Sequence, residues 1–154
     1  MSELPAISVY YIEKSLEMLN RAKILHENLG YIGSVGLVYY SCLHMCAAFV
    51  GLDKPTLAKV HAKEIRRAYK RRYNSSIYSL MDNGTNSLNY WKGLREYSYY
   101  NHYHDNNFKS TADDHDTVLM NISIETPKML SFLQAHFKWL NEHKNCSYNE
   151  MFSL

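Results

Sequence analysis

Apolar residues recur every three or four positions along most of this chain, which is the spacing of one face of an α-helix. The first such stretch covers residues 7–29 and stops at Gly30, a residue typical of helix ends. The second covers 34–50, before Gly51, and is apolar on nearly all sides. Because a helix without a polar face is usually buried, we expect the second helix at the centre of the fold.

Further helices are predicted after Gly51. Pro55 gives the start signal of one helix, and Pro127 predicts a kink or an interruption in the last one. Strand-like alternation is absent over any useful length, and the chain has only six glycines and three prolines. The sequence therefore predicts an all-α, up-and-down bundle of about five helices. The later helices are expected at 56–72, 87–102 and 112–143, with a short one at 75–81.

The length of 154 residues suits a single domain over 1–154, with a core at about 7–143 and a loosely ordered tail at 144–154. No apolar run reaches the roughly 18 residues of a membrane-spanning helix, and the first residues lack the pattern of a signal peptide. Three cysteines, an odd number without such a signal, favour reduced thiols. We therefore expect a cytoplasmic protein without a membrane partner.

Positive charge is concentrated in one segment. The net charge of the chain is +2, but residues 59–72 contain seven lysines and arginines and one acid, so this segment carries +6 and the rest −4. A dense group of cations attracts a polyanion such as RNA, although a solubilising surface has the same pattern. The candidate RNA-binding residues are Lys59, Lys63, Arg66, Arg67, Lys70 and Arg71.

An arginine and a histidine lie seven residues apart in the helix predicted at 87–102. Seven steps of about 100° make nearly two turns, so Arg95 and His102 share one face. The planar arginine side chain can hold two phosphate oxygens, and histidine titrates near neutral pH. The pair suits the handling of a phosphodiester; the alternatives are a solvated helix face or helix caps.

Three segments of the sequence, at 39–48, 59–61 and 95–102, resemble the HEPN family (higher eukaryotes and prokaryotes nucleotide-binding domain). Tyr39–Ala48 is similar to that family's Tyr-Tyr-Ala-x-Phe-His-Ala-Ala pattern, and Lys59–His61 resembles the start of its third helix. Arg95 with the following Ser98–Tyr100 resembles an Arg-x-x-x-Asp-Tyr segment, and its interval to His102 fits the family's Arg-x(4–6)-His ribonuclease motif. The resemblance covers about residues 7–143.

This resemblance implies a metal-independent endoribonuclease without a cofactor, in which the ribose 2′-hydroxyl attacks the adjacent phosphorus. It assigns acid–base catalysis to His102 and stabilisation of the developing charge to Arg95. It also implies a homodimer, and we hypothesise a toxin or defence component with an antitoxin partner. Supporting roles in tuning these groups, bonding to RNA or stacking its bases are expected for Glu96, Ser98, Tyr99, Tyr100, Asn101 and Tyr103.

The spacing of the pair sets a geometric condition. Seven residues separate Arg95 and His102 by roughly 10 Å along a straight helix. Helical side chains lean toward the N-terminus, so His102 leans toward Arg95 while Arg95 leans away. Either the helix ends or bends before His102, or the two groups come from two subunits. We adopt the second interpretation, since the resemblance implies a dimer.

Other histidines are expected to have structural roles. His44 and His61 lie on apolar faces and are interpreted as hydrogen-bonded core residues. The Cys42–Cys46 segment is not a zinc site, because side chains two residues apart on a helix diverge by about 200°. We predict no metal. A less favoured metal-ligand set is His102, His104 and His115.

A function without catalysis also fits the sequence. A catalytically silent HEPN-like module would bind a nucleotide, RNA or a protein partner through the same surface, and a pure dimerisation scaffold would bind no RNA. Whether the protein is an enzyme therefore stays open at this stage. Surface positions of Arg95 and His102 that point apart, without a cleft at a dimer interface, would favour the silent module.

Overall fold

The computed structural model of the chain describes residues 3–56, 58, 61–73, 87–103, 115–150 and 152–154, and only the backbone at 29, 32, 87, 97–103, 115, 116 and 118. These residues form helices α1 (Ala6–Asp53), α2 (Ala62–Tyr73), α3 (Ser87–Tyr103) and α4 (His115–His143). None of them belongs to a strand. Because α1 is bent into two arms, the described chain is an all-α bundle of five helical segments, which confirms the predicted fold class.

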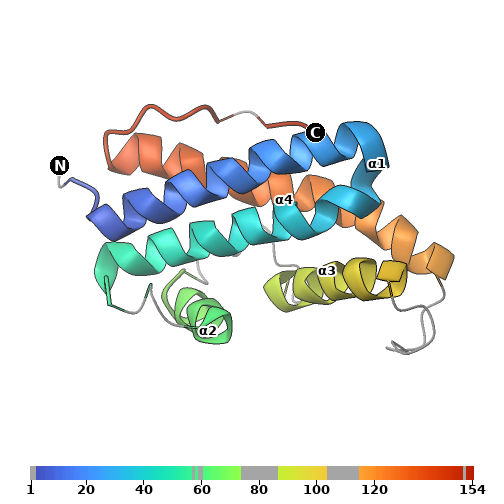
Figure 1. Ribbon diagram of the computed structural model, residues 1–154. Helices are drawn as coiled ribbons and strands as arrows, with labels where there is room; N and C mark the ends of the chain where they lie inside the picture. The colour runs from blue at the N-terminus through green and yellow to red at the C-terminus, as the bar shows by residue number, and fades with distance from the viewer. Residues whose placement is uncertain (1–2, 57, 59–60, 74–86, 104–114, 151) are drawn as a thin grey trace.

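The bend in α1 lies at Gly30, where the sequence predicts the end of the first helix. The φ of 68° and ψ of −159° at Gly30 are not helical, and this region of backbone conformation is almost restricted to glycine. The chain reverses direction there, and the second arm, residues 31–53, returns beside the first (Figure 1).

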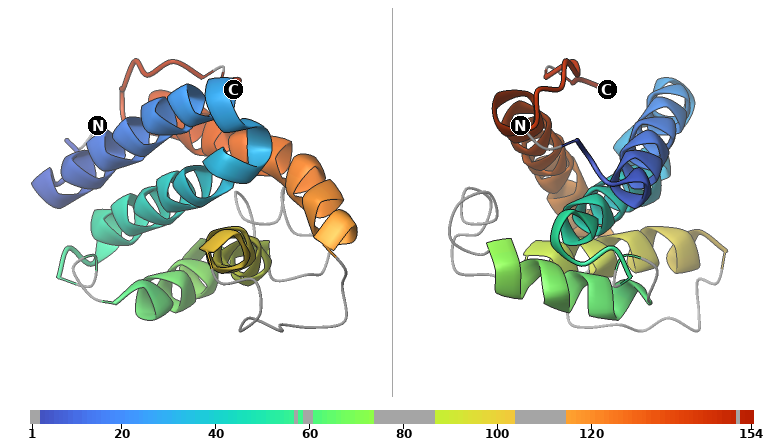
Figure 2. Two further views of the ribbon diagram at one scale, coloured as in Figure 1. Left: turned by 45° about the vertical axis from the view of Figure 1, so that its right-hand side comes forward. Right: turned by 90° about the vertical axis from the view of Figure 1, so that its left-hand side faces the viewer.

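The second arm of α1 is the centre of the bundle. In Figures 1 and 2, the first arm and α4 lie on one side of it, and α2 and α3 lie on the other. Helix α1 contacts each of the other three helices. The central position predicted from the apolar pattern is therefore confirmed. The fully buried side chains of this arm include Val35, Val38, Cys42, Met45, Cys46 and Phe49.

The same arm is long and apolar enough, by length and composition, to cross a membrane over Gly33–Asp53. However, 72% of its most apolar stretch is buried inside the bundle. A buried core helix has the same length and composition, so this stretch is only weak evidence of a membrane span.

The two arms approach closely near their outer ends. The Ser8 hydroxyl donates to the carbonyl of Ala48 at 2.7 Å. A Cβ on Gly51 would lie 2.9 Å from the Ser8 Oγ, so a larger residue would force a shift. The helix continues to Asp53, beyond the end that the sequence predicts. Gly51 therefore permits close packing and does not end the helix.

Helix α2 begins at Ala62 and not near residue 56, as the sequence predicts. His61 lies just before its first turn, where its carbonyl accepts from the backbone N–H of Ile65 at 3.1 Å. His61 is exposed, so its interpretation as a core residue is wrong: the apolar stripe was extended into residues that precede the helix. His44 is half-buried, and its ring stacks against those of Tyr11 and Tyr40.

The core contains a different histidine, His136 of α4, which is fully buried. Its Nδ1 lies 2.6 Å from the carbonyl of Phe132, and its Nε2 lies 2.6 Å from the Tyr69 hydroxyl. Because a carbonyl only accepts, Nδ1 carries the proton and Nε2 accepts from Tyr69. Burial lowers the pKa of His136 to about 3. The neutral ring therefore links α4 to α2 in the core.

Helix α4 continues through Pro127, and the tail that follows it lies extended along its surface (Figure 1). The Asn141 side-chain amide donates to the carbonyl of Tyr148 at 2.8 Å, and its Oδ1 accepts from the Tyr148 N–H at 2.8 Å. The rings of Tyr148 and Phe152 lie 5.2 and 5.1 Å from that of Phe137. These contacts hold much of the tail that the sequence leaves loosely ordered.

Candidate nucleic-acid interface

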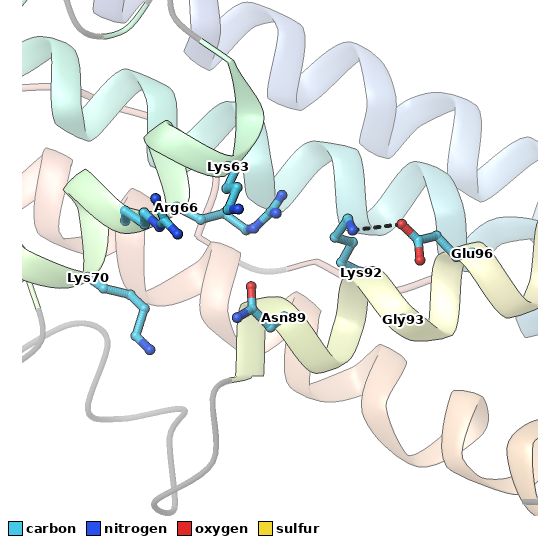
Figure 3. Close-up of a pocket in the computed structure, with 8 residues that line it drawn as sticks. Lys63, Arg66, Lys70, Asn89, Lys92, Gly93 and Glu96 are labelled. Atoms are coloured by element: carbon cyan, nitrogen blue, oxygen red, sulfur yellow. Dashed lines mark ion pairs between the residues drawn. The ribbon is translucent and has the colours of Figure 1, made fainter. Parts of the chain in front are cut away.

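A groove lies between α2 and α3, and we call it the basic groove. Its volume is about 550 Å³, within the usual range of ligand sites. Five lysines and arginines line it with one carboxylate, so its field favours anions. The residues that line the basic groove are Lys63, Arg66, Arg67, Lys70, Asn89, Lys92, Gly93 and Glu96 (Figure 3).

Helical spacing brings the two walls of the groove together. On α2, the other lining residues follow Lys63 by three, four and seven positions, which places them along one side of the helix. The lining residues of α3, from Asn89 to Glu96, have the same spacing. The basic face predicted from the sequence thus meets α3, the helix that carries the arginine–histidine pair.

Arg66 is a buried member of this set, although the sequence places it with solvated cations. The residue is only 8% exposed. Its Nη1 donates to the Tyr39 hydroxyl at 2.9 Å, and its Nε has no hydrogen-bond partner among the described residues. Burial raises the pKa of Tyr39 to about 12, against the opposing effect of Arg66, so the phenol stays protonated. Tyr39 therefore fixes the guanidinium without neutralising it.

Arg95 rests on the central arm of α1. Its Nη1 donates to the Tyr40 hydroxyl at 3.1 Å, and its Cζ lies 5.2 Å from the centre of the Tyr40 ring. A Cβ on Gly36 would lie 3.3 Å from the Arg95 Cγ, so the glycine leaves room for this side chain. The Glu96 Oε1 lies 3.6 Å from the Arg95 Nη2, and it forms an ion pair with the Lys92 Nζ at 2.8 Å.

A smaller cavity of about 250 Å³ joins Arg95 to the basic groove. Tyr39, Tyr40 and Arg95 line this cavity, and three further residues, Lys63, Arg66 and Lys92, line both it and the groove. The arginine of the predicted ribonuclease motif and the cations of α2 therefore belong to one continuous surface. The sequence alone does not indicate this junction.

The structure places the predicted RNA-binding residues of α2 in two different cavities. Lys63, Arg66, Arg67 and Lys70 line the basic groove. Arg71 lines a separate cavity with Asp53 and Arg72, so the structure does not bring it to the groove. With Ala68 and Arg72 it faces the end of α1, where Val50 and Asp53 line the same cavity. Lys59 lies outside the described residues.

The predicted arginine–histidine pair lies within one helix, and α3 continues past His102 to Tyr103. The possibility that the helix ends before His102 is therefore excluded. Among the supporting candidates, Glu96 is described and lies beside Arg95. The side chains of the other candidates lie outside the described part of the chain, as do those of the less favoured metal set. These are His102, Ser98, Tyr99, Tyr100, Asn101, Tyr103, His104 and His115.

Several residues of the site are missed by sequence reasoning. Asn89, Lys92 and Gly93 complete the wall formed by α3, and their spacing from Glu96 is a signal that would have found them. Tyr39 and Tyr40 stand out in the sequence only through the family resemblance.

Comparisons with protein-family models, curated proteins and solved structures find no match. Any proposal for the function therefore rests on the geometry of the groove and on the motif in α3.

Gly93 offers a way to alter the groove without disturbing the core. A Cβ at this helical position would meet nothing within 4 Å. We therefore expect Gly93→Ala to stabilise the protein by about 0.5–1 kcal/mol, the helix preference of alanine over glycine. Gly93→Glu should retain most of that gain but place a carboxylate in the groove and weaken the RNA binding predicted for the basic face. Thermal unfolding and fluorescence anisotropy measure the two effects; equal RNA affinity in both variants would contradict this placement.

Proposed function

We propose that the protein is a metal-independent endoribonuclease of the HEPN type that holds its RNA substrate in the basic groove. The observation that carries this proposal is the junction described above. Arg95 and the cations of α2 line adjoining cavities that share Lys63, Arg66 and Lys92. A chain bound along the groove would present its phosphates to Arg95. No metal is required for this chemistry, since an arginine can stabilise the charge on phosphorus.

The proposed reaction is an internal transesterification of RNA. A base removes the proton of the ribose 2′-hydroxyl, the 2′-oxygen forms a bond to phosphorus, and the bond from phosphorus to the 5′-oxygen breaks. The 5′-oxygen takes up a proton, so the products carry a 2′,3′-cyclic phosphate and a 5′-hydroxyl. His102 is the proposed acid–base group because histidine titrates near neutral pH, and Arg95 stabilises the negative charge on the phosphate.

A homodimer is part of this proposal. Because α3 continues past His102, Arg95 and His102 of one subunit stay about 10 Å apart along the helix axis. Pairing of two α3 helices would bring the arginine of one copy near the histidine of the other. We also propose a cytoplasmic location, and an antitoxin protein that controls the activity in the setting of defence.

The test is RNA cleavage by the purified protein in EDTA. Unstructured RNA is incubated with wild-type protein, Arg95→Ala and His102→Ala, and the product ends are identified by mass spectrometry. We expect cyclic phosphate ends from wild type and strongly reduced cleavage by both variants. Equal cleavage by all three proteins would identify a contaminating nuclease and overturn the mechanism.

One observation favours the second candidate, a catalytically silent module that binds RNA or a nucleotide. The Arg95 guanidinium is already bonded to Tyr40 and lies near Glu96, so its positive charge is partly compensated. Such a residue suits steady binding as well as catalysis. RNA binding by the wild-type protein without cleavage of any substrate would favour this candidate.

A further inference from the structure

Two consecutive tyrosines of α1 each hold an arginine from a different helix. Tyr39 accepts from Arg66 of α2 at 2.9 Å, and Tyr40 accepts from Arg95 of α3 at 3.1 Å. Arg95 also lies over both rings, with its Cζ 5.9 Å from the centre of Tyr39. Because neighbouring residues of one helix bond to both guanidinium groups, the central arm of α1 sets their relative position.

The charge of Arg66 is the unusual feature of this arrangement. A buried cation is costly unless an anion compensates it. Within the described residues, Arg66 forms no ion pair; its described partner is the neutral phenol of Tyr39, and its buried Nε has none. The Nε of Arg95 is also buried without a described partner. Both arginines line the 250 Å³ cavity, where an anion would reach them.

We infer that Arg66 and Arg95 form a specific pocket for one phosphate group of a bound RNA backbone. This inference deepens the proposed function, on which the choice of RNA as ligand rests. The pocket is smaller than the roughly 300–1,000 Å³ of sites for whole drug-sized ligands, so it suits one group of a longer chain. Arginine forks match the oxygens of a phosphate.

The surroundings of the pocket favour a polynucleotide over a free anion. Lys63 and Lys92 belong to both cavities, and the basic groove continues from them toward Arg67 and Lys70. Neighbouring phosphates of an RNA strand would follow these cations. In this arrangement Arg66 and Arg95 define the register of the strand, while the lysines add affinity that depends on salt.

Binding to an RNA that cannot be cleaved tests the pocket separately from catalysis. A fluorescent single-stranded oligonucleotide with 2′-O-methyl groups is titrated with wild type, Arg66→Lys, Arg95→Lys and the double variant. Each lysine keeps the charge but loses the planar fork, so each single variant should bind about tenfold more weakly. If both arginines hold one phosphate, the double variant should lose far less than the hundredfold that independent sites predict.

Two further variants make the result decisive. Tyr39→Phe keeps the ring but frees Arg66, so it should weaken binding with little change in the helical signal of circular dichroism. Arg21→Lys, an exposed site on α1 paired with Glu17, is the matched control and should bind as wild type. Unchanged affinity in Arg66→Lys and Tyr39→Phe, or a hundredfold loss in the double variant, would overturn the shared pocket. Because this RNA is not cleaved, an inactive protein with these binding losses would refute only the nuclease.

Discussion

Replacing Arg95 by alanine should reduce the rate of RNA cleavage by about a hundredfold or more, the usual effect of removing one group that stabilises a developing negative charge. The residue stands where the groove meets the central helix, and it lines the cavity shared by α1, α2 and α3. The rate at saturating RNA is the informative quantity, because a group that acts mainly in the transition state changes the rate more than the affinity.

Two controls separate catalysis from folding in this experiment. The aliphatic part of Arg95 packs over Gly36, so Arg95→Ala should also lower the free energy of unfolding modestly. Arg95→Lys retains that packing and the charge, and an intermediate rate is expected. Lys92→Ala changes a groove cation one turn earlier on α3 and should weaken binding more than it slows cleavage. A full rate in Arg95→Ala would remove Arg95 from the mechanism.

Acidification should destabilise the protein through His136. The unfolded histidine takes up a proton near pH 6.5, while burial keeps the folded residue neutral until about pH 3. Between these values the unfolded state binds more protons, so stability is lost as the pH falls. From pH 7 to pH 4 the expected loss is about 3 kcal/mol. Urea unfolding at a series of pH values measures this slope.

Substitution of His136 identifies the source of that slope. His136→Gln should be less stable than wild type at pH 7 by about 1–3 kcal/mol, because the glutamine amide cannot reproduce the geometry of both imidazole hydrogen bonds, to Tyr69 and to the Phe132 carbonyl. Its stability should then change much less between pH 7 and pH 4. His143→Gln, on the exposed end of α4, is the matched control and should keep the wild-type slope.

Two other groups, His44 and Asp53, also contribute to the pH dependence of stability. Burial also lowers the pKa of His44, which adds a smaller loss of stability in the same direction. The hydrogen bond from Arg72 holds the pKa of Asp53 below its usual value, so its contribution is lost only at still lower pH. An unchanged slope in His136→Gln would contradict the assignment to the core histidine.

The helices were predictable because their apolar spacing is a local property. The stop at Gly30 followed from the sequence, since few other residues adopt its backbone conformation. The errors lie where packing decides. Gly51 looked like a helix end but allows two arms to touch, and His61 looked like a core residue but precedes α2. The roles of these two residues depend on which segments pack together, and the sequence does not show that.

The candidate site was predictable only in part for the same reason. Charge density identified the basic face of α2, and the helical spacing to His102 together with a family resemblance identified Arg95 on α3. Neither showed that these surfaces adjoin, that Arg66 is buried against Tyr39, or that Arg71 faces another cavity. Residues on different helices have no fixed relation in sequence, so spacing rules do not reach them.

The sequence by itself determined the helical class, the central position of the most apolar segment and the presence of one dense group of cations. These properties depend on spacing and composition within single helices. The tertiary structure alone decided which cations face α3, which arginine is desolvated and which histidine is in the core. Those outcomes depend on how helices pack against one another, and packing sets burial, hydrogen-bond partners and pKa.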